Sequence, residues 1–265
     1  MRLAQPAYLA EQYRNGSNLN ARIQLHARFS TNHYGLHRWV FDQLDLAPES
    51  RILELGCGTA ALWRENLDRL PAGWEVMFSD LSPGMVQEAR RSLASCQQAL
   101  AFAVIDAQAI PFREASSDGV IANHMLYHVP DRRKALAEIR RVLKPGGRFY
   151  ASTIGRAHLR ELGDLVDRFL PEGEHWGVST AEGFLLENAA EQLAPWFSDV
   201  RLGRYEDSLL ITEARPLIAY VLSDAKSLTG ERLAAFVQEV ERELATHSAI
   251  HISKDSGILT GVRSG

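Results

Sequence analysis

The stretch ILELGCGTA, from Ile52 to Ala60, decides the fold of this chain. A short apolar run that ends in glycine is typical of a buried strand followed by a tight turn. A Gly-x-Gly turn after a strand often lays its backbone N–H groups against a phosphate. Glu54 stands two residues before the first glycine, however, and its carboxylate would repel a phosphate. The stretch therefore leaves two alternatives open, a dinucleotide and a ligand without phosphate.

The region from Arg51 to Thr153 alternates short β-rich segments with helical patterns. Ser82 is placed to cap one of these helices, with Pro83 at its first position. The alternation predicts an α/β fold, a doubly wound, Rossmann-like parallel sheet with helices on both faces. The expected strands are residues 51–55, 74–80, 99–106, 119–123 and 148–153, and the expected helices are residues 61–70, 82–93 and 131–143.

Several residues stand where the expected strands end. In a doubly wound sheet, ligands bind at the carboxyl ends of the strands, near the switch in strand order. The residues at these ends are Glu54, Gly56, Asp80, Asp106 and Asn123. Because they share one edge of the sheet, we predict that they form a ligand site. Taken alone, Glu54 or Asp80 could equally be the cap of a helix.

A carboxylate at position 54 suits a cationic ligand. S-adenosylmethionine carries an ammonium and a sulfonium group and no phosphate, and its carboxylate can use the N–H groups of the glycine loop. Asp80 follows that loop by about 20 residues, where the corresponding acid of NAD enzymes accepts hydrogen bonds from the ribose hydroxyls. Asp106 is placed to accept from the adenine amino group, with the backbone at Ala107 assisting.

Five segments of this region resemble the successive motifs of the class I S-adenosylmethionine-dependent methyltransferases, in the small-molecule branch often called methyltransferase type 11. They are ILELGCGTA, SDLSPGMVQEAR, VIDAQAIPF, GVIANHMLYHVPD and LKPGGRFYAST. The resemblance implies a seven-stranded sheet with one antiparallel strand, expected in the last hairpin. It also implies S-adenosylmethionine as the cofactor and S-adenosylhomocysteine as the product. Ser79 departs from the family, which usually has an apolar residue or glycine there.

The resemblance assigns each part of the cofactor to particular positions. Tyr13 and Arg22 would close over it, because the family uses its N-terminal segment as a lid. The other implied contacts are Glu54, Gly56 and Gly58 with the methionine part, Asp80 with the ribose, Leu81 and Met85 with the adenine face, Asp106 and Ala107 with the adenine edge, and Asn123 with the sulfonium.

The segment NHMLYHVPD supplies the candidate catalytic residues. Methyl transfer is an in-line displacement, so the protein mainly has to orient its two reactants. A hydroxyl acceptor also needs a base within hydrogen-bond reach, and histidine is the usual one. His124 is the first candidate for that base and His128 the second, with local packing as the alternative for His128. Tyr127 is expected to form a wall of the acceptor site.

The chain beyond Thr153 departs from the alternation. Helices are expected over residues 155–170 and 180–193, strand character over 197–211, and a long helix through Leu233 and Leu244. The final stretch AIHISKDSGILTGVR reads as a hairpin that turns at KDSG, residues 254–257. We therefore expect four segments: an N-terminal helical lid at residues 1–40, a cofactor-binding core at 41–155, a helical cap insertion at 156–195, and at 196–265 the remainder of the core sheet with C-terminal helices.

The amino-acid composition bears on which partners the protein is expected to bind. The 265 residues carry a net charge of −4, which gives no basic excess for nucleic acid or an anionic membrane. The basic run at residues 131–144 is expected to be the solvated face of a helix. Two cysteines and the absence of a long apolar stretch or signal-peptide core lead us to expect a cytoplasmic protein. A monomer or a homodimer is expected, and the sequence does not distinguish between them. His33 and His37 have no third ligand nearby, so no metal is expected.

These observations predict a methyltransferase that moves a methyl group to an oxygen or nitrogen atom of a small acceptor held under a helical cap. Two alternatives stay open at this stage. One is a protein that binds S-adenosylmethionine without transferring its methyl group, because the motifs describe cofactor binding only. The other is an NAD-dependent oxidoreductase, against which Glu54 and the later motifs argue.

Overall fold

The computed structural model describes residues 18–96, 98, 100–177 and 181–265, and only the backbone of residues 18–23. These residues form two compact units, as far as the following ranges are described. The sheet unit comprises Tyr34–Arg156, Thr180–Tyr205 and Ser256–Gly265, and the helical unit comprises Met1–His33, Ala157–Ser179 and Glu206–Asp255.

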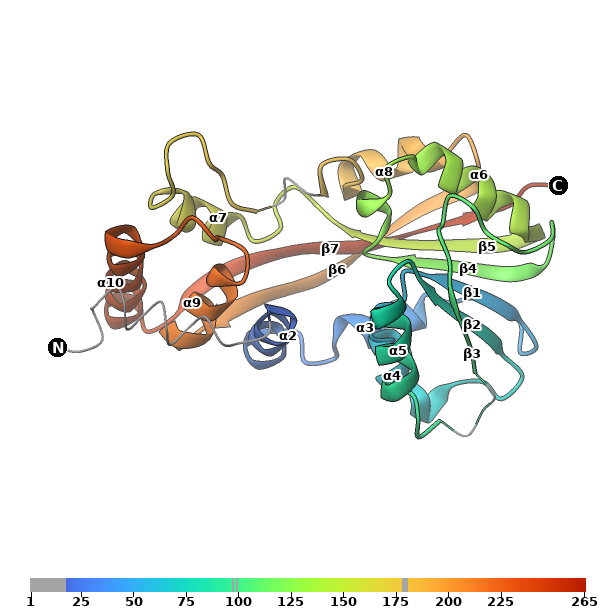
Figure 1. Ribbon diagram of the computed structural model, residues 1–265, viewed down its shortest axis with the longest axis horizontal. Coiled ribbons are helices and arrows are strands. Elements are labelled where there is room, and N and C mark those ends of the chain that lie inside the picture. The colour runs from blue at the N-terminus through green and yellow to red at the C-terminus, as the bar shows by residue number, and fades with distance from the viewer. Residues whose placement is uncertain (1–17, 97, 99, 178–180) are drawn as a thin grey trace. The chain divides into compact units, whose positions relative to one another are not determined.

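A seven-stranded sheet organises the first unit, in the order β3-β2-β1-β4-β5-β7-β6 (Figure 1). The pairs from β3 to β5 are parallel, and β7 runs antiparallel to β5. The order reverses between β1 and β4, which makes the crevice at their carboxyl ends the expected ligand position. The strands are β1 (Arg51–Leu55), β2 (Glu75–Asp80), β3 (Ala101–Val104), β4 (Ser117–Asn123), β5 (Leu143–Ile154), β6 (Ser198–Ile211) and β7 (Ile250–Val262). By residue number, β6 and β7 each extend from one unit into the other.

Helices cover both faces of this sheet (Figure 1). On one face lie α6 (Arg132–Val142) and α8 (Leu186–Leu193), and on the other lie α3 (Leu36–Asp42), α4 (Ala61–Arg64) and α5 (Pro83–Ser92). Short 3-10 turns are η1 (Leu67–Arg69) and η2 (Leu126–His128). The doubly wound, seven-stranded sheet with helices on both faces and one antiparallel strand is therefore confirmed.

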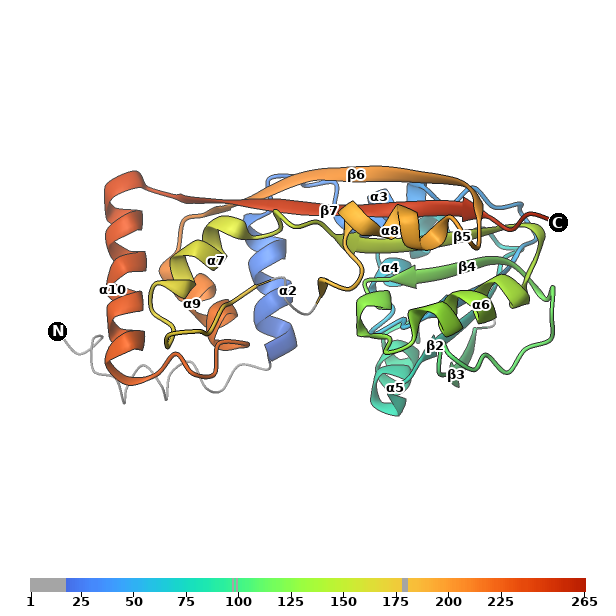
Figure 2. The same cartoon turned by 90° about the horizontal axis from the view of Figure 1, so that it is seen from above.

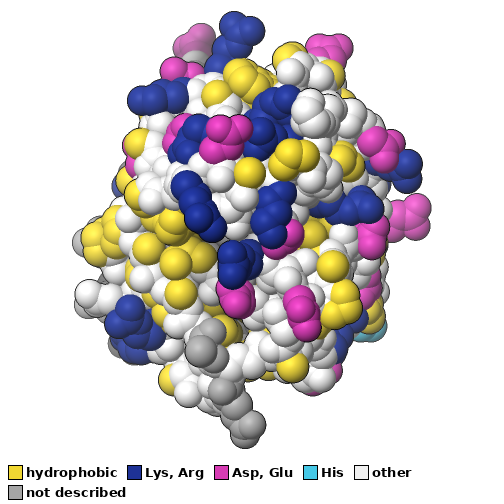
Figure 3. Space-filling model, turned by 90° about the vertical axis from the view of Figure 1, so that its right-hand side faces the viewer, with side chains coloured by type: hydrophobic (Ala, Val, Ile, Leu, Met, Phe, Trp, Pro, Cys, Tyr) yellow, Lys and Arg dark blue, Asp and Glu magenta, His cyan; other side chains and the backbone are white. Residues whose placement is uncertain are grey.

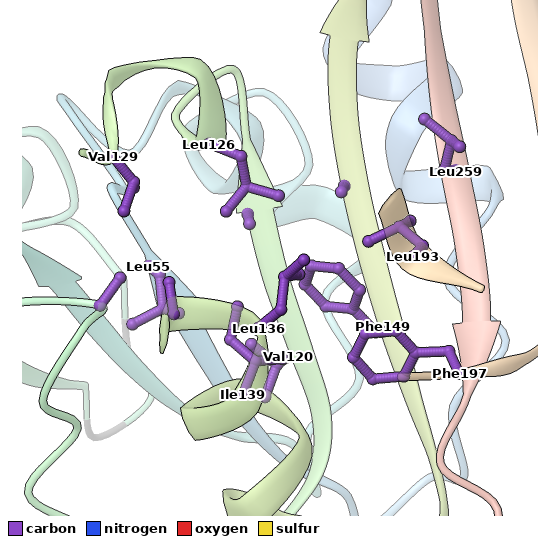
Figure 4. Close-up of a cluster of buried hydrophobic side chains, with 14 of the residues drawn as sticks. Leu55, Val120, Leu126, Val129, Leu136, Ile139, Phe149, Leu193, Phe197 and Leu259 are labelled. Carbon is purple, nitrogen blue, oxygen red and sulfur yellow. The ribbon is translucent and has the colours of Figure 1, made fainter. Parts of the chain in front are cut away.

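The two faces of β1 enter different cores, because side chains alternate along a strand. Leu53 and Leu55 pack with residues of α6 and α8, where Phe149 stacks on Phe197 at 4.9 Å between ring centroids (Figure 4). Ile52 belongs instead to the cluster on the α3, α4 and α5 face. The same alternation turns Glu54 toward that second face.

The helical unit has its own core. Figure 2 shows its helices gathered together: α2 (Asn18–Phe29), α7 (Arg160–Asp167), α9 (Ala214–Leu222) and α10 (Gly230–His247). Apolar residues from each helix share one buried cluster, among them Leu25, Leu162, Leu217 and Phe236. The long helix expected through Leu233 is α10, whereas α9 had no counterpart among the expected elements.

The predicted C-terminal hairpin is wrong, because residues 250–262 form the single strand β7. Its polar residues find partners within the sheet instead of turning into solvent. Lys254 pairs with the buried Asp207, and Ser256 is only 2% exposed. A side chain on Gly257 would meet the carbonyl oxygen of Gly203, so this glycine marks a close backbone approach and not a turn.

The units differ from the segments expected from the sequence. We expected residues 196–265 to form one segment, the remainder of the core sheet with C-terminal helices. Residues 206–255 of this segment, which include α9 and α10, lie with the helical unit. Residues 181–195 lie with the sheet unit, although we expected them in the cap. Leu186, Ala189 and Leu193 of α8 form an apolar stripe that packs against the sheet. Such a stripe predicts a buried helix face without specifying which core it covers.

The surface of the sheet unit is mixed in charge on the face drawn in Figure 3, where lysine and arginine side chains are interspersed with acidic ones. None of the described helices is long and apolar enough to span a bilayer.

Candidate cofactor site

The glycine loop after β1 is shaped by left-handed backbone. Gly56 has a φ of +66°, a conformation that costs a residue with a side chain about 1–2 kcal/mol. A Cβ at this position would also lie 2.7 Å from Cβ of Met125, which is too close for any side chain. Gly58 has a φ of +54°, and Ala60 follows at +57°. These turns bring the chain back over the end of β1 and place α4 beside Glu54.

Glu54 is the buried acid of this loop, with 2% of its surface exposed. Its Oε2 accepts a hydrogen bond of 2.6 Å from the indole Nε1 of Trp63. Its Oε1 accepts a longer one of 3.4 Å from Nδ2 of Asn123. Burial, together with the smaller effect of the nearby charge of Asp80, outweighs these two donors and raises the pKa of Glu54 to about 7.

Asp80 ties the glycine loop to the end of β2. Its carboxylate accepts from the backbone N–H of Gly58 at 3.0 Å and from that of Ser82 at 2.9 Å. Each carboxylate oxygen has a second lone pair, so acceptor capacity remains for ribose hydroxyls. The unusual Ser79 is fully buried and donates to the carbonyl oxygen of Glu54 at 2.7 Å, so a hydroxyl here holds β2 against the end of β1.

Leu81 and Met85, the residues expected against the adenine face, come shortly after Asp80 in the sequence. Leu81 is 67% exposed although it is a large apolar side chain, as expected for a surface that a flat ligand covers. Met85 is half-buried in the first turn of α5, where its N–H donates to Oγ of the capping Ser82 at 3.4 Å. The predicted cap and the proline at the first helical position are confirmed.

Asp106 stands just after β3. Hydrogen bonds from the backbone and side chain of Gln108 lower its pKa, so this carboxylate is ionised at neutral pH. Ala107 beside it is buried. The segment that follows is held from α6, where Arg141 donates to the carbonyl oxygens of Ile110 and Phe112 at 2.9 and 2.7 Å. The basic run on α6 is thus not only a solvated face, because Arg141 is half-buried and organises this loop.

Asn123 ends β4 beside Glu54, and His124 directly follows the strand. Oδ1 of Asn123 is buried and accepts no hydrogen bond from any described residue. His124 has a φ of +49°, and its backbone N–H donates to the carbonyl oxygen of Ser152 at 3.1 Å. A positive φ is uncommon for a residue with a side chain and often marks a functional position. Nε2 of His124 is buried from solvent.

Tyr127 and His128 lie on the next turn, η2. Their rings are in edge contact with centroids 4.5 Å apart, and His128 is exposed while Tyr127 packs against the core. Tyr13 lies outside the described residues, as does the side chain of Arg22. Of the histidines considered for metal, His37 instead pairs with Glu65 at 3.1 Å. The described part of the chain contains no group of three or more side chains that could hold a metal ion.

The chemistry of this edge suits a cation better than a phosphate. Glu54 and Asp80 are both acidic, and their hydrogen bonds within the described residues come from uncharged N–H groups. The buried acceptor of Asn123 adds an oxygen without a donor. A ligand with an ammonium group would satisfy these oxygens, whereas a phosphate would add negative charge beside them.

Comparison with known proteins decides the family. The family described as a methyltransferase domain matches residues 53–151. The ubiquinone biosynthesis O-methyltransferase of Xanthomonas oryzae pv. oryzae (strain PXO99A) is 34% identical over 197 residues, which cover 67% of this chain and 81% of that protein. The chain belongs to the class I S-adenosylmethionine-dependent methyltransferases.

Other relatives are similar to this chain over part of their length. The biotin biosynthesis bifunctional protein BioHC of Cellvibrio japonicus is 32% identical over 79% of this chain and 43% of that protein, so the chain spans less than half of that relative. The C-methyltransferase UbiE of ubiquinone and menaquinone biosynthesis in Bordetella avium is 32% identical over 46% of this chain and 49% of that protein.

A solved structure confirms the fold. The S-adenosylmethionine-dependent methyltransferase from Aquifex aeolicus superposes with a TM-score of 0.53 and 10% sequence identity, covering 94% of this chain and 100% of that chain. At this identity the similarity concerns the fold alone.

The structure thus gathers Glu54, Gly56, Gly58, Asp80 and Asn123 of the methyltransferase around the ends of β1, β2 and β4. Sequence reasoning missed the residues that organise them. Trp63 lay within the expected helix of residues 61–70 without a role of its own, and Ser79 was noted only as a departure from the family. The spacing between Glu54 and an indole nine residues later is a usable signal only once the left-handed loop between them is known.

Proposed function

We propose that this methyltransferase moves a methyl group from S-adenosylmethionine to an oxygen or nitrogen atom of a small-molecule acceptor. The observation that carries the proposal is the buried Glu54, whose contacts are neutral donors and the acidic Asp80. A buried acid left without a cation is costly, so the site favours a ligand that brings one.

The residues at the strand ends fit the parts of this cofactor. Glu54 and the open acceptor of Asn123 would receive its ammonium group. Asp80 would accept from the ribose hydroxyls, Leu81 and Met85 would cover the adenine, and Asp106 and Ala107 would hold the adenine edge. When bound, S-adenosylmethionine supplies an electrophilic methyl group on a sulfonium, so the protein has mainly to orient the acceptor in line with it.

His124 is the residue that we assign to the acceptor. It directly follows Asn123, and the two hydrogen bonds of its backbone N–H to Ser152 fix where the side chain emerges. A neutral imidazole there can take the proton of a hydroxyl, whereas an amine has only to be uncharged. The relatives are named for both O- and C-methylation, so our assignment of the acceptor atom rests on this histidine.

Further properties support a small acceptor in a reducing compartment. The net charge of −4 does not favour nucleic acid, and the face in Figure 3 carries both signs of charge. Cys57 and Cys96 are free thiols, which is in keeping with a cytoplasmic enzyme.

Replacing Asp80 tests the cofactor site. Asp80→Ala should weaken binding of S-adenosylmethionine by at least about tenfold, because hydrogen bonds to a charged group contribute about 1.5–3 kcal/mol each. Asp118→Ala is the matched control. Asp118 also accepts two hydrogen bonds, from the N–H of Arg51 and from Lys144. It lies near the first residue of β4, whereas the proposed cofactor site lies at the other end of that strand, beside Asn123. Equal affinities in the two variants would remove Asp80 from the site.

The base is tested separately with a hydroxyl acceptor found by screening for methylated products. His124→Ala should lower kcat by about a hundredfold or more and abolish its fall at acidic pH. Turnover that survives across the pH range would show that His124 is not a base.

A further inference from the structure

Trp63 lies next to the proposed cofactor site without reaching a surface from which it could bind substrate. It belongs to α4, directly after the glycine loop, and only 1% of its surface is exposed. Its indole Nε1 is 2.6 Å from Oε2 of Glu54, which is the shortest contact that this acid makes in the described residues.

The aromatic residues around Trp63 prevent its ring from turning. Phe41 and Trp74 meet it edge-on at 6.2 and 6.3 Å between ring centroids, and Phe78 does so at 5.4 Å. Such edge-to-face packing fixes the plane of the indole and therefore the direction of its N–H. The donor is held toward Glu54 whether or not a ligand is present.

We propose that Trp63 is a positioning residue of the cofactor site, whose indole N–H keeps Glu54 oriented and ionised for the cationic end of S-adenosylmethionine. The inference rests on the proposed function, because it requires Glu54 to receive that cation. It concerns a residue that touches neither the cofactor nor the acceptor.

The groups around Glu54 show why this donor matters. Burial favours the neutral acid, and the facing charge of Asp80 on β2 is also negative. The thiol of Cys57 in the loop stays neutral, because burial raises its pKa. Among the described residues, two donors oppose the effects of burial and of Asp80, namely Trp63 and the more distant Asn123 on β4. Without the indole N–H, the carboxyl group would be held at 3.4 Å by Asn123 alone, and it would be neutral over a wider pH range.

Trp63→Phe removes the donor and keeps a ring in the cluster. Trp74→Phe is the matched control, because Trp74 is buried in the same cluster and donates its indole N–H to the carbonyl oxygen of Ala47 at 2.9 Å. Both variants lose one indole hydrogen bond and the same volume. Only Trp63→Phe loses a bond to Glu54.

The first readout is the Kd of S-adenosylmethionine, measured by calorimetric titration between pH 6 and 9. We expect Trp63→Phe to bind about tenfold more weakly than Trp74→Phe at pH 7, the effect of one charge-assisted hydrogen bond. The ratio of the two Kd values should fall toward one as pH rises, because Glu54 then ionises without help. Taking the ratio cancels the titration of the cofactor's own amine. A ratio near one at every pH would overturn the proposal, as would a ratio that does not change with pH.

The second readout needs no ligand. In the free protein, the indole N–H signal of Trp63 in a nitrogen–proton NMR spectrum should shift with pH, with a midpoint near the pKa of Glu54, about 7. The shift should vanish in Glu54→Gln, and the signal of Trp74 should not follow this titration. An indole signal of Trp63 that is insensitive to pH would contradict the proposal.

These results separate the inference from the function on which it rests. If the wild type and Trp74→Phe both fail to bind S-adenosylmethionine, the proposed function fails. If both bind, Glu54→Gln binds weakly and Trp63→Phe matches Trp74→Phe, only the positioning role of Trp63 fails.

Discussion

Two buried acids, one in each unit, are held in opposite ways. In the described part of the chain, the side chain of Glu54 on β1 accepts from the neutral donors Trp63 and Asn123, and a second acid, Asp80, lies nearby. Asp207 on β6 has a fully buried side chain that pairs with the ammonium of Lys254 and accepts from Oγ of Ser30 at 2.5 Å. It also accepts from the backbone N–H of Asn32 at 3.0 Å.

The pKa values of the two acids diverge accordingly. Burial raises the pKa of Glu54 to about 7, and its neutral donors do not offset this effect. Burial also acts to raise the pKa of Asp207, but the hydrogen bonds from Lys254, Ser30 and Asn32 outweigh it and lower the pKa overall. Asp207 is paired with a cation of the protein itself, which suits a structural role. Glu54 has no such partner among the described residues and is therefore suited to a ligand that carries a positive charge.

Removing the cation from Asp207 should have the largest effect. Lys254→Met leaves a buried charge unpaired, and we expect the free energy of unfolding to fall by about 3–5 kcal/mol. Urea unfolding followed by circular dichroism measures this change. Arg242→Met is the control in the same unit. Arg242 pairs with Glu239 on the surface, so its loss should lower the free energy of unfolding far less. Equal losses in the two variants would break the comparison.

Neutralising Glu54 should instead stabilise the ligand-free protein at alkaline pH. The pKa of this acid rises from 4.5 unfolded to about 7 folded, so the native state holds a proton that the unfolded state has lost. Stability therefore falls as pH rises through this window, by roughly 3 kcal/mol in total. Glu54→Gln should lack that loss, so its advantage over the wild type should grow between pH 5 and 8. Parallel curves for both proteins across this range would refute the assigned burial effect.

A smaller change tests how the support of Asp207 is shared. Ser30→Ala removes one hydroxyl donor while Lys254 remains, so we expect a loss of about 1 kcal/mol in the free energy of unfolding. Ser227→Ala removes a hydroxyl donor of the same kind from an exposed carboxylate, that of Glu174, and should be nearly neutral. If the two serine variants behave alike, burial does not strengthen the bond to Asp207.

A local residue pattern predicted the importance of Glu54, whereas no local pattern predicted that of Asp207. Glu54 lies inside a glycine-rich stretch with its own periodicity, and its neighbours at the strand ends follow from the alternation of strands and helices. The partners of Asp207 come from distant positions, Lys254 and Ser30, that no local pattern connects. The polar run around Lys254 therefore resembled a turn, because the sequence does not show that Lys254 pairs with the buried Asp207.

The details of the site divide in the same way. The positions of Asp80, Asp106 and Asn123 were predictable because Asp80 and Asn123 end β2 and β4, and Asp106 follows β3 by two residues. The contact between Glu54 and Trp63 depends on left-handed backbone at three alternate positions, Gly56, Gly58 and Ala60, which reverses the chain. The contact of Ser79 depends on the register of β1 against β2. Such contacts require backbone geometry that a residue pattern does not specify.

One measurement tests the central claim that Glu54 receives the cationic end of the cofactor. It is calorimetric titration of the wild type with S-adenosylmethionine, S-adenosylhomocysteine and NAD in parallel, repeated with Glu54→Gln. We predict micromolar binding of both sulfur compounds to the wild type, no binding of NAD, and at least about tenfold weaker binding of S-adenosylmethionine to the variant. Binding of NAD alone, or unchanged affinity in Glu54→Gln, would contradict the claim and return the glycine loop to the role of a phosphate cradle.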